Sequence, residues 1–128
     1  MKAKTFLAAA AVGTLAMLGG VQPVASATVQ NIHSCTDNHV CNCPSVGSGT
    51  HQCSLRIPNF PGGRLVMDGG VRGGSGRATL LLIQGKVICQ HVGFPSTGGS
   101  KECQAGAGPL TVEFNYPGPG TAFAGARY

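Results

Sequence analysis

The feature that most constrains the fold is a set of six cysteines in a chain of 128 residues. An even number of cysteines in a short exported chain predicts structural disulfides, three in this case. Each disulfide restricts the unfolded chain and typically adds about 2 to 4 kcal/mol, comparable with much of the net stability of a small domain. Cys89 and Cys103 are expected to pair, because they close a loop short enough to form early. We interpret all six as structural: Cys35, Cys41, Cys43, Cys53, Cys89 and Cys103.

Histidines beside the first cysteines offer metal binding as an alternative to disulfides. His39 precedes Cys41 and Cys43, and His33 and His51 lie close by in the sequence. Thiolate and imidazole are ligands of zinc and copper. Export normally oxidises thiols first, however, and C-x-C differs from the C-x-x-C spacing of zinc knuckles and thiol oxidoreductases. We therefore expect Cys41 and Cys43 to belong to two different bridges, and we expect no metal or other cofactor.

Residues 1–27 have the three-part pattern of a cleaved secretory signal peptide. Lys2 and Lys4 form a positive start, an apolar run follows up to Leu18, and Ala-Ser-Ala ends the segment. The apolar run is short and is followed by glycines, which argues against a transmembrane anchor, and no later run approaches the ~20 apolar residues that a span requires. We expect residues 28–128 to remain as a single secreted, extracellular domain.

Residues 77–92, RATLLLIQGKVICQHV, contain the clearest hairpin signal in the chain. Two apolar runs, Ala78–Ile83 and Lys86–Val92, flank the dipeptide Gln84-Gly85, and glycine supplies the positive φ that a tight turn needs. The first run is apolar on both faces, which predicts a central strand that is covered on both sides. We expect the other strands to assemble around this hairpin.

Shorter alternating segments predict further strands, each bounded by glycine or proline. Leu110–Tyr116 has the cleanest alternation, and His51–Ile57, ended by Pro58, and Arg64–Asp68 are weaker examples. Thr121–Tyr128 is expected to form either a last edge strand or a frayed tail. The predicted fold class is all-β: a small, disulfide-linked antiparallel sandwich or barrel of about five to seven short strands with Gly/Pro-rich loops.

Three segments lack a strand pattern and predict loops. Thr28–Thr50 is polar, carries three of the cysteines and leaves room for one short strand. Gly69–Gly76 (GGVRGGSG) has the composition of an exposed, mobile loop. Gly93–Gly108 is a second glycine-rich segment and contains Cys103.

The titratable and nucleophilic residues form no recognisable catalytic set. Asp37, Asp68, Glu102 and Glu113 are the acids of the chain, and their positions do not indicate an acid–base pair. There is no G-x-S-x-G segment, and no helix follows the glycine-rich stretch to hold a phosphate group. His91, on a predicted core strand, is interpreted as a hydrogen-bonded structural histidine rather than a general base. We expect no catalytic residue and no enzymatic activity.

The basic character of the chain is mild. Its formal net charge is +5, and without Lys2 and Lys4 the basic residues exceed the acids by three. The basic residues are scattered singly and tryptophan is absent, whereas a nucleic-acid surface needs basic clusters interleaved with stacking aromatics. A basic amphipathic helix for membranes is also missing. The pattern excludes nucleic-acid and membrane-surface binding, and we interpret the charge as an aid to solubility.

Binding is the function that remains, and five residues are the candidates for it. Phe60 and Arg64 lie on a Pro/Gly-braced turn, Phe94 lies in a second turn, and Arg127 and Tyr128 end the chain. These residue types are enriched at protein interfaces. The competing interpretation is that Phe60 and Phe94 fold back as lids over the ends of the sandwich, and that the C-terminal segment is simply the last strand.

The leader and the disulfide-rich, glycine-rich β chain are similar in type to small exported proteins of Gram-positive bacteria. That group includes protease inhibitors, antimicrobial β domains and small adaptor subunits of secreted toxin assemblies. The leading hypothesis is a non-enzymatic domain that binds another extracellular protein as an adaptor subunit, toxin component or inhibitor. A cell-wall or glycan-binding or antimicrobial module is an alternative, although Tyr116 and Tyr128 are few for a sugar platform. The third hypothesis is a small metal-binding protein or enzyme using one of four histidines: His33, His39, His51 or His91.

Overall fold

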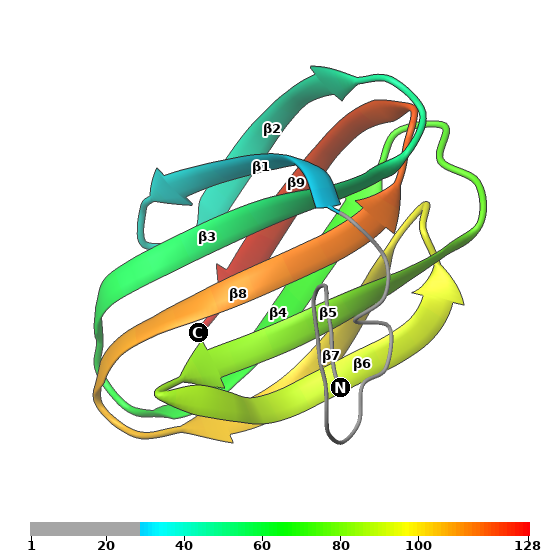
Figure 1. Cartoon of the computed structure of the whole chain (residues 1–128). Helices are drawn as coiled ribbons and strands as arrows, with labels where there is room; N and C mark the ends of the chain where they lie inside the picture. The colour runs from blue at the N-terminus through cyan, green and yellow to red at the C-terminus, as the bar shows by residue number, and fades with distance from the viewer. Residues whose placement is uncertain (1–28) are drawn as a thin grey trace, which may run out of the picture.

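In the computed structural model, residues 29–128 form nine β-strands in two packed sheets (Figure 1). The structure describes residues 29–128, so the expected signal peptide lies outside the described residues. The five-stranded sheet has the order β1-β3-β8-β5-β6 and the four-stranded sheet the order β2-β9-β4-β7. The described part contains no helix long and apolar enough to cross a membrane. The strands are β1 (Val29–Thr36), β2 (Val40–Val46), β3 (Thr50–Phe60), β4 (Gly63–Val71), β5 (Arg77–Gln84), β6 (Lys86–Pro95), β7 (Gly99–Ala105), β8 (Gly108–Pro117) and β9 (Gly120–Arg127).

The hydrophobic core lies between the two sheets and is built from alternate side chains of the strands. On β8 the residues Leu110, Val112, Phe114 and Tyr116 are all buried, as the sequence alternation predicts. Successive side chains of a strand point to opposite faces, so Glu113 between them lies on the outer face of the sheet. The predicted all-β sandwich is confirmed, with more strands than expected.

The hairpin formed by β5 and β6 is confirmed, with Gly85 at a φ of 79° between the paired strands. β5 lies between β8 and β6 in the sheet, but only one of its faces is buried. Leu80 and Leu82 are fully buried, whereas Thr79 and Leu81 on the other face are partly exposed. The expectation of a strand covered on both sides is therefore wrong. The outward side chains of β5 border a groove instead.

Two strands, β1 and β2, occupy the first segment that was expected to form loops. β1 pairs in parallel with β3, so the five-stranded sheet is mixed rather than purely antiparallel. β2 pairs antiparallel with β9. Both are edge strands with mostly exposed side chains, so they show no apolar alternation. Because few of their side chains are buried, these two segments are held in the extended conformation by the disulfides and by hydrogen bonds to the neighbouring strands.

Three other boundaries differ from expectation. β3 continues through Pro58 to Phe60, because a register irregularity after Ile57 takes the proline out of the regular hydrogen-bonded ladder. β7 lies in the segment expected as a glycine-rich loop, and of its residues only Cys103 is buried. β9 lies between β2 and β4 rather than at an edge, and its inward residues are alanines, whose small side chains give a weak apolar signal.

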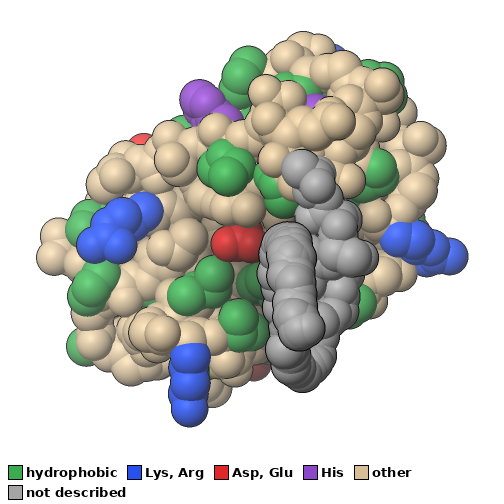
Figure 2. Space-filling model, in the orientation of Figure 1, with side chains coloured by type: hydrophobic (Ala, Val, Ile, Leu, Met, Phe, Trp, Pro, Cys, Tyr) green, Lys and Arg blue, Asp and Glu red, His purple; other side chains and the backbone are tan. Residues whose placement is uncertain are grey.

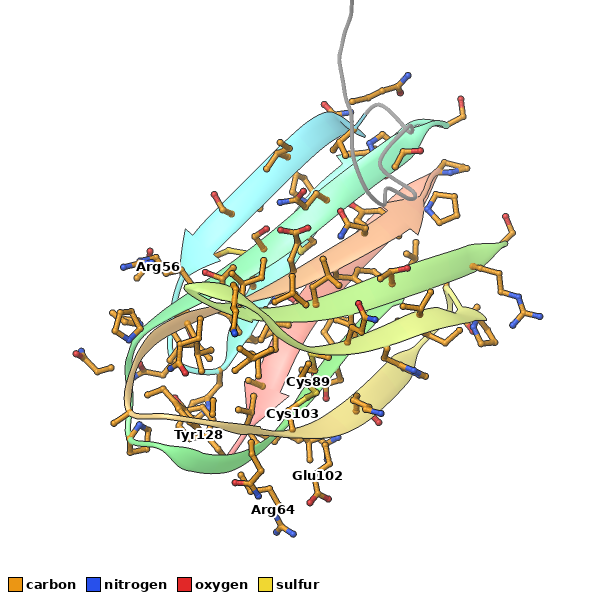
Figure 3. The ribbon with its side chains drawn as sticks, turned by 60° about the horizontal axis from the view of Figure 1, so that its bottom comes forward. Arg56, Arg64, Cys89, Glu102, Cys103 and Tyr128 are labelled. Atoms are coloured by element: carbon orange, nitrogen blue, oxygen red, sulfur yellow. A yellow bond between two sulfur atoms is a disulfide. The ribbon has the colours of Figure 1, made fainter. Side chains whose placement is uncertain are left out.

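All three disulfides join one sheet to the other. Their pairings confirm that Cys41 and Cys43 belong to different bridges. They also confirm that Cys89 pairs with Cys103 (Figure 3). β1 and β2 are edge strands on one side of the sandwich, and β6 and β7 are edge strands on the other. The bridges therefore close both sides. They link β1 to β2, β2 to β3 and β6 to β7 as Cys35–Cys41, Cys43–Cys53 and Cys89–Cys103.

The glycine-rich segment 69–76 is a structured turn rather than an open loop. Its first three residues belong to β4. Ser96 holds the remainder: its hydroxyl donates to the Ser75 carbonyl at 2.9 Å and its backbone N–H donates to the Gly76 carbonyl at 3.0 Å. Ser96 is itself buried, so the turn is fixed to a side chain of the protein interior.

Candidate functional site

Two of the five predicted binding residues are core residues. Phe60, at the end of β3, is 2% exposed, and Phe94, near the end of β6, is 4% exposed. The Phe94 ring stacks on His91 with the ring centroids 4.5 Å apart, and its centroid lies 6.1 Å from that of Phe114. Both rings fold back onto the sandwich, as in the competing interpretation. This arrangement is favourable because burying a phenylalanine contributes about 1.5–3 kcal/mol. Rings buried in this way do not form part of an exposed binding surface.

The other three predicted residues are exposed and lie together at one end of the four-stranded sheet. Arg127 on β9 pairs with Val66 on β4, and Arg64 lies two residues before Val66 on the same outer face. Glu102 on β7 is the other partner of Val66. Figure 3 shows Arg64, Glu102 and Tyr128 at the same end of the molecule. We call Arg64, Glu102, Arg127 and Tyr128 the C-terminal surface.

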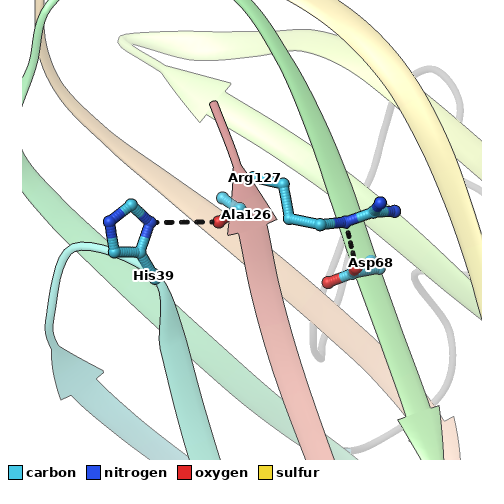
Figure 4. Close-up of polar contacts among 4 residues, drawn as sticks. All are labelled: His39, Asp68, Ala126 and Arg127. Atoms are coloured by element: carbon cyan, nitrogen blue, oxygen red, sulfur yellow. Dashed lines mark hydrogen bonds and ion pairs between the residues drawn. The ribbon is translucent and has the colours of Figure 1, made fainter.

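Each arginine of the C-terminal surface is paired with a carboxylate on a neighbouring strand. Arg64 Nη1 lies 3.6 Å from Glu102 Oε2, and Arg127 Nε donates to Asp68 Oδ2 at 3.1 Å (Figure 4). Both arginines are well exposed, and an exposed ion pair contributes only about 0–1 kcal/mol. The pairs therefore position the arginines, but either arginine can exchange its carboxylate for an acid of another molecule at little energetic cost.

Tyr128 is held by three contacts rather than being free at the end of the chain. Its hydroxyl donates to the Asn38 carbonyl at 2.8 Å. Its ring packs edge-on against Phe60 at 5.0 Å and lies 4.9 Å from the His39 ring. His39 is fixed in turn, because its Nδ1 donates to the Ala126 carbonyl at 3.4 Å (Figure 4). Tyr128 remains 44% exposed, so the buried Phe60 supports an exposed tyrosine.

The turn between β1 and β2, which receives the Tyr128 hydroxyl, is ordered by Asp37. The carboxylate of Asp37 accepts hydrogen bonds from the backbone N–H groups of His39 at 2.9 Å and of Val40 at 3.3 Å. These two bonds favour the ionised form and hold the pKa of Asp37 below its usual 3.8. Asp37 is therefore ionised at neutral pH, and the turn keeps its hydrogen bonds there.

The histidine–cysteine cluster considered for metal binding is brought together, but its cysteines are oxidised. A ring nitrogen of His33 and the sulfurs of Cys41 and Cys43 lie within 4.8 Å of one another. Each sulfur is bonded to a different cysteine. Zinc and copper bind the thiolate, and a disulfide sulfur does not carry that charge. In the disulfide form, His33 is the only good ligand of the cluster.

The remaining histidines have structural contacts. His51 is 1% exposed; its Nε2 donates to the Gly47 carbonyl at 2.7 Å and its Nδ1 accepts from the Asn31 amide at 3.1 Å. A single neutral tautomer satisfies both bonds. His91 was expected to be a hydrogen-bonded core histidine, but it is partly exposed and is held by stacking on Phe94.

The outer face of the five-stranded sheet carries a groove of about 800 Å³ that was not predicted. Leu81, Val87 and Val92 supply its apolar wall, and Glu113 and Asn115 supply polar groups; we call these five residues the outer groove. Figure 2, in the view onto this sheet, shows apolar side chains around an acidic one. The signal in the sequence is the run of β5 that is apolar on both faces, because its outward side chains also need cover.

These features define a disulfide-linked β-sandwich domain with two separate candidate surfaces. No protein-family model matches the chain, and no curated protein matches its sequence. Among solved structures it is similar to the pre-peptidase C-terminal domain of a collagenase from Bacillus anthracis, with 13% identity and a TM-score of 0.51 over 75% of this chain and 94% of that one. It is also similar to PliG, a periplasmic inhibitor of g-type lysozyme from Aeromonas hydrophila, with 11% identity and a TM-score of 0.43 over 77% and 100% of the two chains.

At these identities the likeness to the collagenase domain shows the fold alone. It supports the description of the chain as a small all-β domain. The likeness to the lysozyme inhibitor is weaker still and carries no argument. The fold alone does not determine the function, which depends on the residues of the two surfaces.

Proposed function

We propose that the protein is a secreted, non-enzymatic domain that binds another extracellular protein through the C-terminal surface. The observation that carries this proposal is the placement of Arg64, Arg127 and Tyr128 at one end of the sandwich, exposed yet held by defined contacts. Tyrosine and arginine are enriched among the residues that dominate interface energies. Side chains that are already ordered lose little conformational entropy on binding, which favours affinity.

The charges of the C-terminal surface indicate the chemistry of its partner. Two exposed arginines and an amphipathic tyrosine lie at the same end of the sandwich, so a partner that offers carboxylates beside an apolar group fits best. Asp68 and Glu102 hold the arginines in the free protein and are displaced by the acids of the partner. A role as adaptor subunit, toxin component or inhibitor is compatible with such a contact, since each of these acts by tight binding without turnover.

A mutational binding experiment tests the proposal. Native mass spectrometry of the protein recovered from culture medium identifies any stoichiometric complex, and affinity is then measured for an Arg64→Ala/Arg127→Ala variant and a Tyr128→Ala variant. We expect each to weaken binding about tenfold or more. Arg72→Ala is the matched control, because Arg72 is exposed just beyond the other end of β4 from Arg64. Unchanged affinity in the double variant, with the protein still folded, would reject this surface.

Glycan binding receives less support from the geometry. Sugar platforms present flat aromatic rings to solvent, and of the two tyrosines in the chain Tyr116 is 3% exposed. Phe60, Phe94 and Phe114 are buried as well, and Phe123 on β9 is the one phenylalanine among residues 29–128 that is exposed, at 36%. The ring of Tyr128 packs against the rings of Phe60 and His39 and does not present an open face on which a sugar could stack. We therefore place protein binding first.

A further inference from the structure

We infer that the outer groove is a second binding site, and that it takes a polypeptide segment carrying one Lys or Arg between aliphatic side chains. The site lies on the five-stranded sheet, whereas the C-terminal surface lies mainly on the four-stranded sheet. The inference goes beyond the proposed function and does not depend on it. It follows from the strand register, from the exposed aliphatic side chains and from one carboxylate.

The strand register places the polar and apolar residues of the groove side by side. Glu113 on β8 is directly opposite Leu81 on β5. Asn115 is opposite Thr79, and Thr79 is opposite Val92 on β6. Directly opposite residues share one face of a sheet with their Cβ atoms about 5 Å apart. Glu113 therefore lies where the polar half of the outer face meets its aliphatic half.

The aliphatic half of the groove is unusually exposed for a sheet face. Val92 is 63% exposed and Val87 is 47% exposed, and both lie on the edge strand β6. Leu81 beside them is partly exposed. Covering such side chains is favourable in proportion to the apolar area removed from water. Aliphatic side chains of a polypeptide provide that cover, whereas sugars require aromatic rings, and the rings of β8 point into the core.

Glu113 gives the groove its charge preference. Its Oε2 accepts a hydrogen bond from the Asn115 amide at 2.9 Å. The ion pairs found among residues 29–128 are Arg64–Glu102 and Arg127–Asp68, so Glu113 has no cationic partner in that part of the chain. A ligand that covers the groove removes water from this carboxylate, which is unfavourable unless the ligand supplies a cation. Arg77 also lines the groove, but it lies four residues before Leu81 on β5 and donates to the Gly93 carbonyl at 3.2 Å, so the preference for a cation applies to the part of the groove beside Glu113.

Peptide selection tests the inference. Short random peptides displayed on phage are selected against the purified protein, whose processed N-terminus is checked by mass spectrometry, and enriched peptides are synthesised for affinity measurement. We expect the enriched sequences to share a Lys or Arg flanked by Leu, Ile or Val. Glu113→Gln removes the charge at constant size and is expected to weaken binding about tenfold. Val92→Thr keeps the shape of the side chain and is expected to weaken binding several-fold.

Two controls make the result specific to the groove. Glu102→Gln removes an exposed carboxylate from the other sheet and is expected to leave peptide affinity unchanged, as is the Arg64→Ala/Arg127→Ala variant. Loss of peptide binding in those variants would overturn the assignment to the groove. Full binding by Glu113→Gln, or selection of acidic peptides, would also overturn it. So would preferential binding of a synthetic peptide of residues 1–27, which would assign the groove to the N-terminal segment of the chain itself.

Discussion

The hydroxyl of Tyr128 lies 2.8 Å from the carbonyl oxygen of Asn38, 90 positions earlier in the sequence. Asn38 lies within the loop closed by the Cys35–Cys41 disulfide. The last residue of the chain is therefore tied to the first disulfide loop. This contact joins the C-terminal surface to the β1–β2 turn and makes them one structural unit.

Removing the hydroxyl of Tyr128 tests that unit. Tyr128→Phe loses the hydrogen bond to Asn38 but keeps the ring, so we expect the free energy of unfolding to fall by about 0.5–1.5 kcal/mol. Tyr128→Ala is expected to lose more, because it also removes the contacts with Phe60 and His39. Urea unfolding of the oxidised protein measures both values. An unchanged Tyr128→Phe variant would show that the hydrogen bond does not contribute.

The disulfides are expected to contribute according to the loops they close. Cys89 and Cys103 are 14 residues apart, and a Cys89→Ser/Cys103→Ser variant should lose roughly 3 kcal/mol of stability. Cys35 and Cys41 are 6 residues apart, and removing that bridge should cost roughly 2 kcal/mol. Guanidinium unfolding without reductant compares the two variants. The reverse order would show that lost packing, rather than chain entropy, dominates.

Alkaline pH is expected to destabilise the protein through Tyr116. Burial raises the pKa of Tyr116 above its usual 10.0, because the buried phenolate is poorly solvated. The stability gained from keeping the phenol neutral is complete below pH 10.0 and is lost as the pH rises through the folded-state pKa. We expect the melting temperature to fall more steeply above that pH than in Tyr116→Phe, which cannot ionise there. Parallel curves for the two proteins would contradict this explanation.

Gly99 is expected to be intolerant of a side chain. A methyl group at this position would collide with the ring of Phe94, which cannot move freely because it is stacked on His91 and packed near Phe114. We expect Gly99→Ala to cost about 1–3 kcal/mol. Gly98→Ala is the matched control, since among residues 29–128, apart from the two adjacent residues, the atom nearest its added methyl group is the Gly69 carbonyl oxygen, 4.0 Å away. Similar melting temperatures in calorimetry would show that Phe94 can repack.

Strands with large inward side chains could be predicted from the sequence, whereas the others gave a weak signal, as in β9, or none. β8 and the β5–β6 hairpin carry leucines, valines and aromatic rings at regular spacing. β9 turns alanines inward and β7 buries only Cys103, so neither shows a clear period. β1 is held by its ladder to β3 and by a disulfide, and these contacts are made with residues distant in sequence.

Residue type alone suggests candidate binding residues, but it does not show which of them are exposed. Arg64, Arg127 and Tyr128 are exposed, and their binding role stays a prediction, whereas Phe60 and Phe94 were predicted on the same grounds and are buried. Whether each phenylalanine is buried depends on the backbone near the ends of β3 and β6. The pairing of both strands is irregular there, and the sequence does not reveal this. The outer groove requires the register of three strands, since Glu113, Leu81 and Val92 come together only by pairing.

Each disulfide spans a connection where the chain passes from one sheet to the other. A protease that cuts once within residues 36–40, 44–52 or 90–102 therefore leaves both new ends covalently attached. No strand is released by such a nick, and the paired sheets keep their partners. In surroundings rich in secreted proteases, the domain therefore stays in one covalent piece after a single cut in any of these three connections between the sheets.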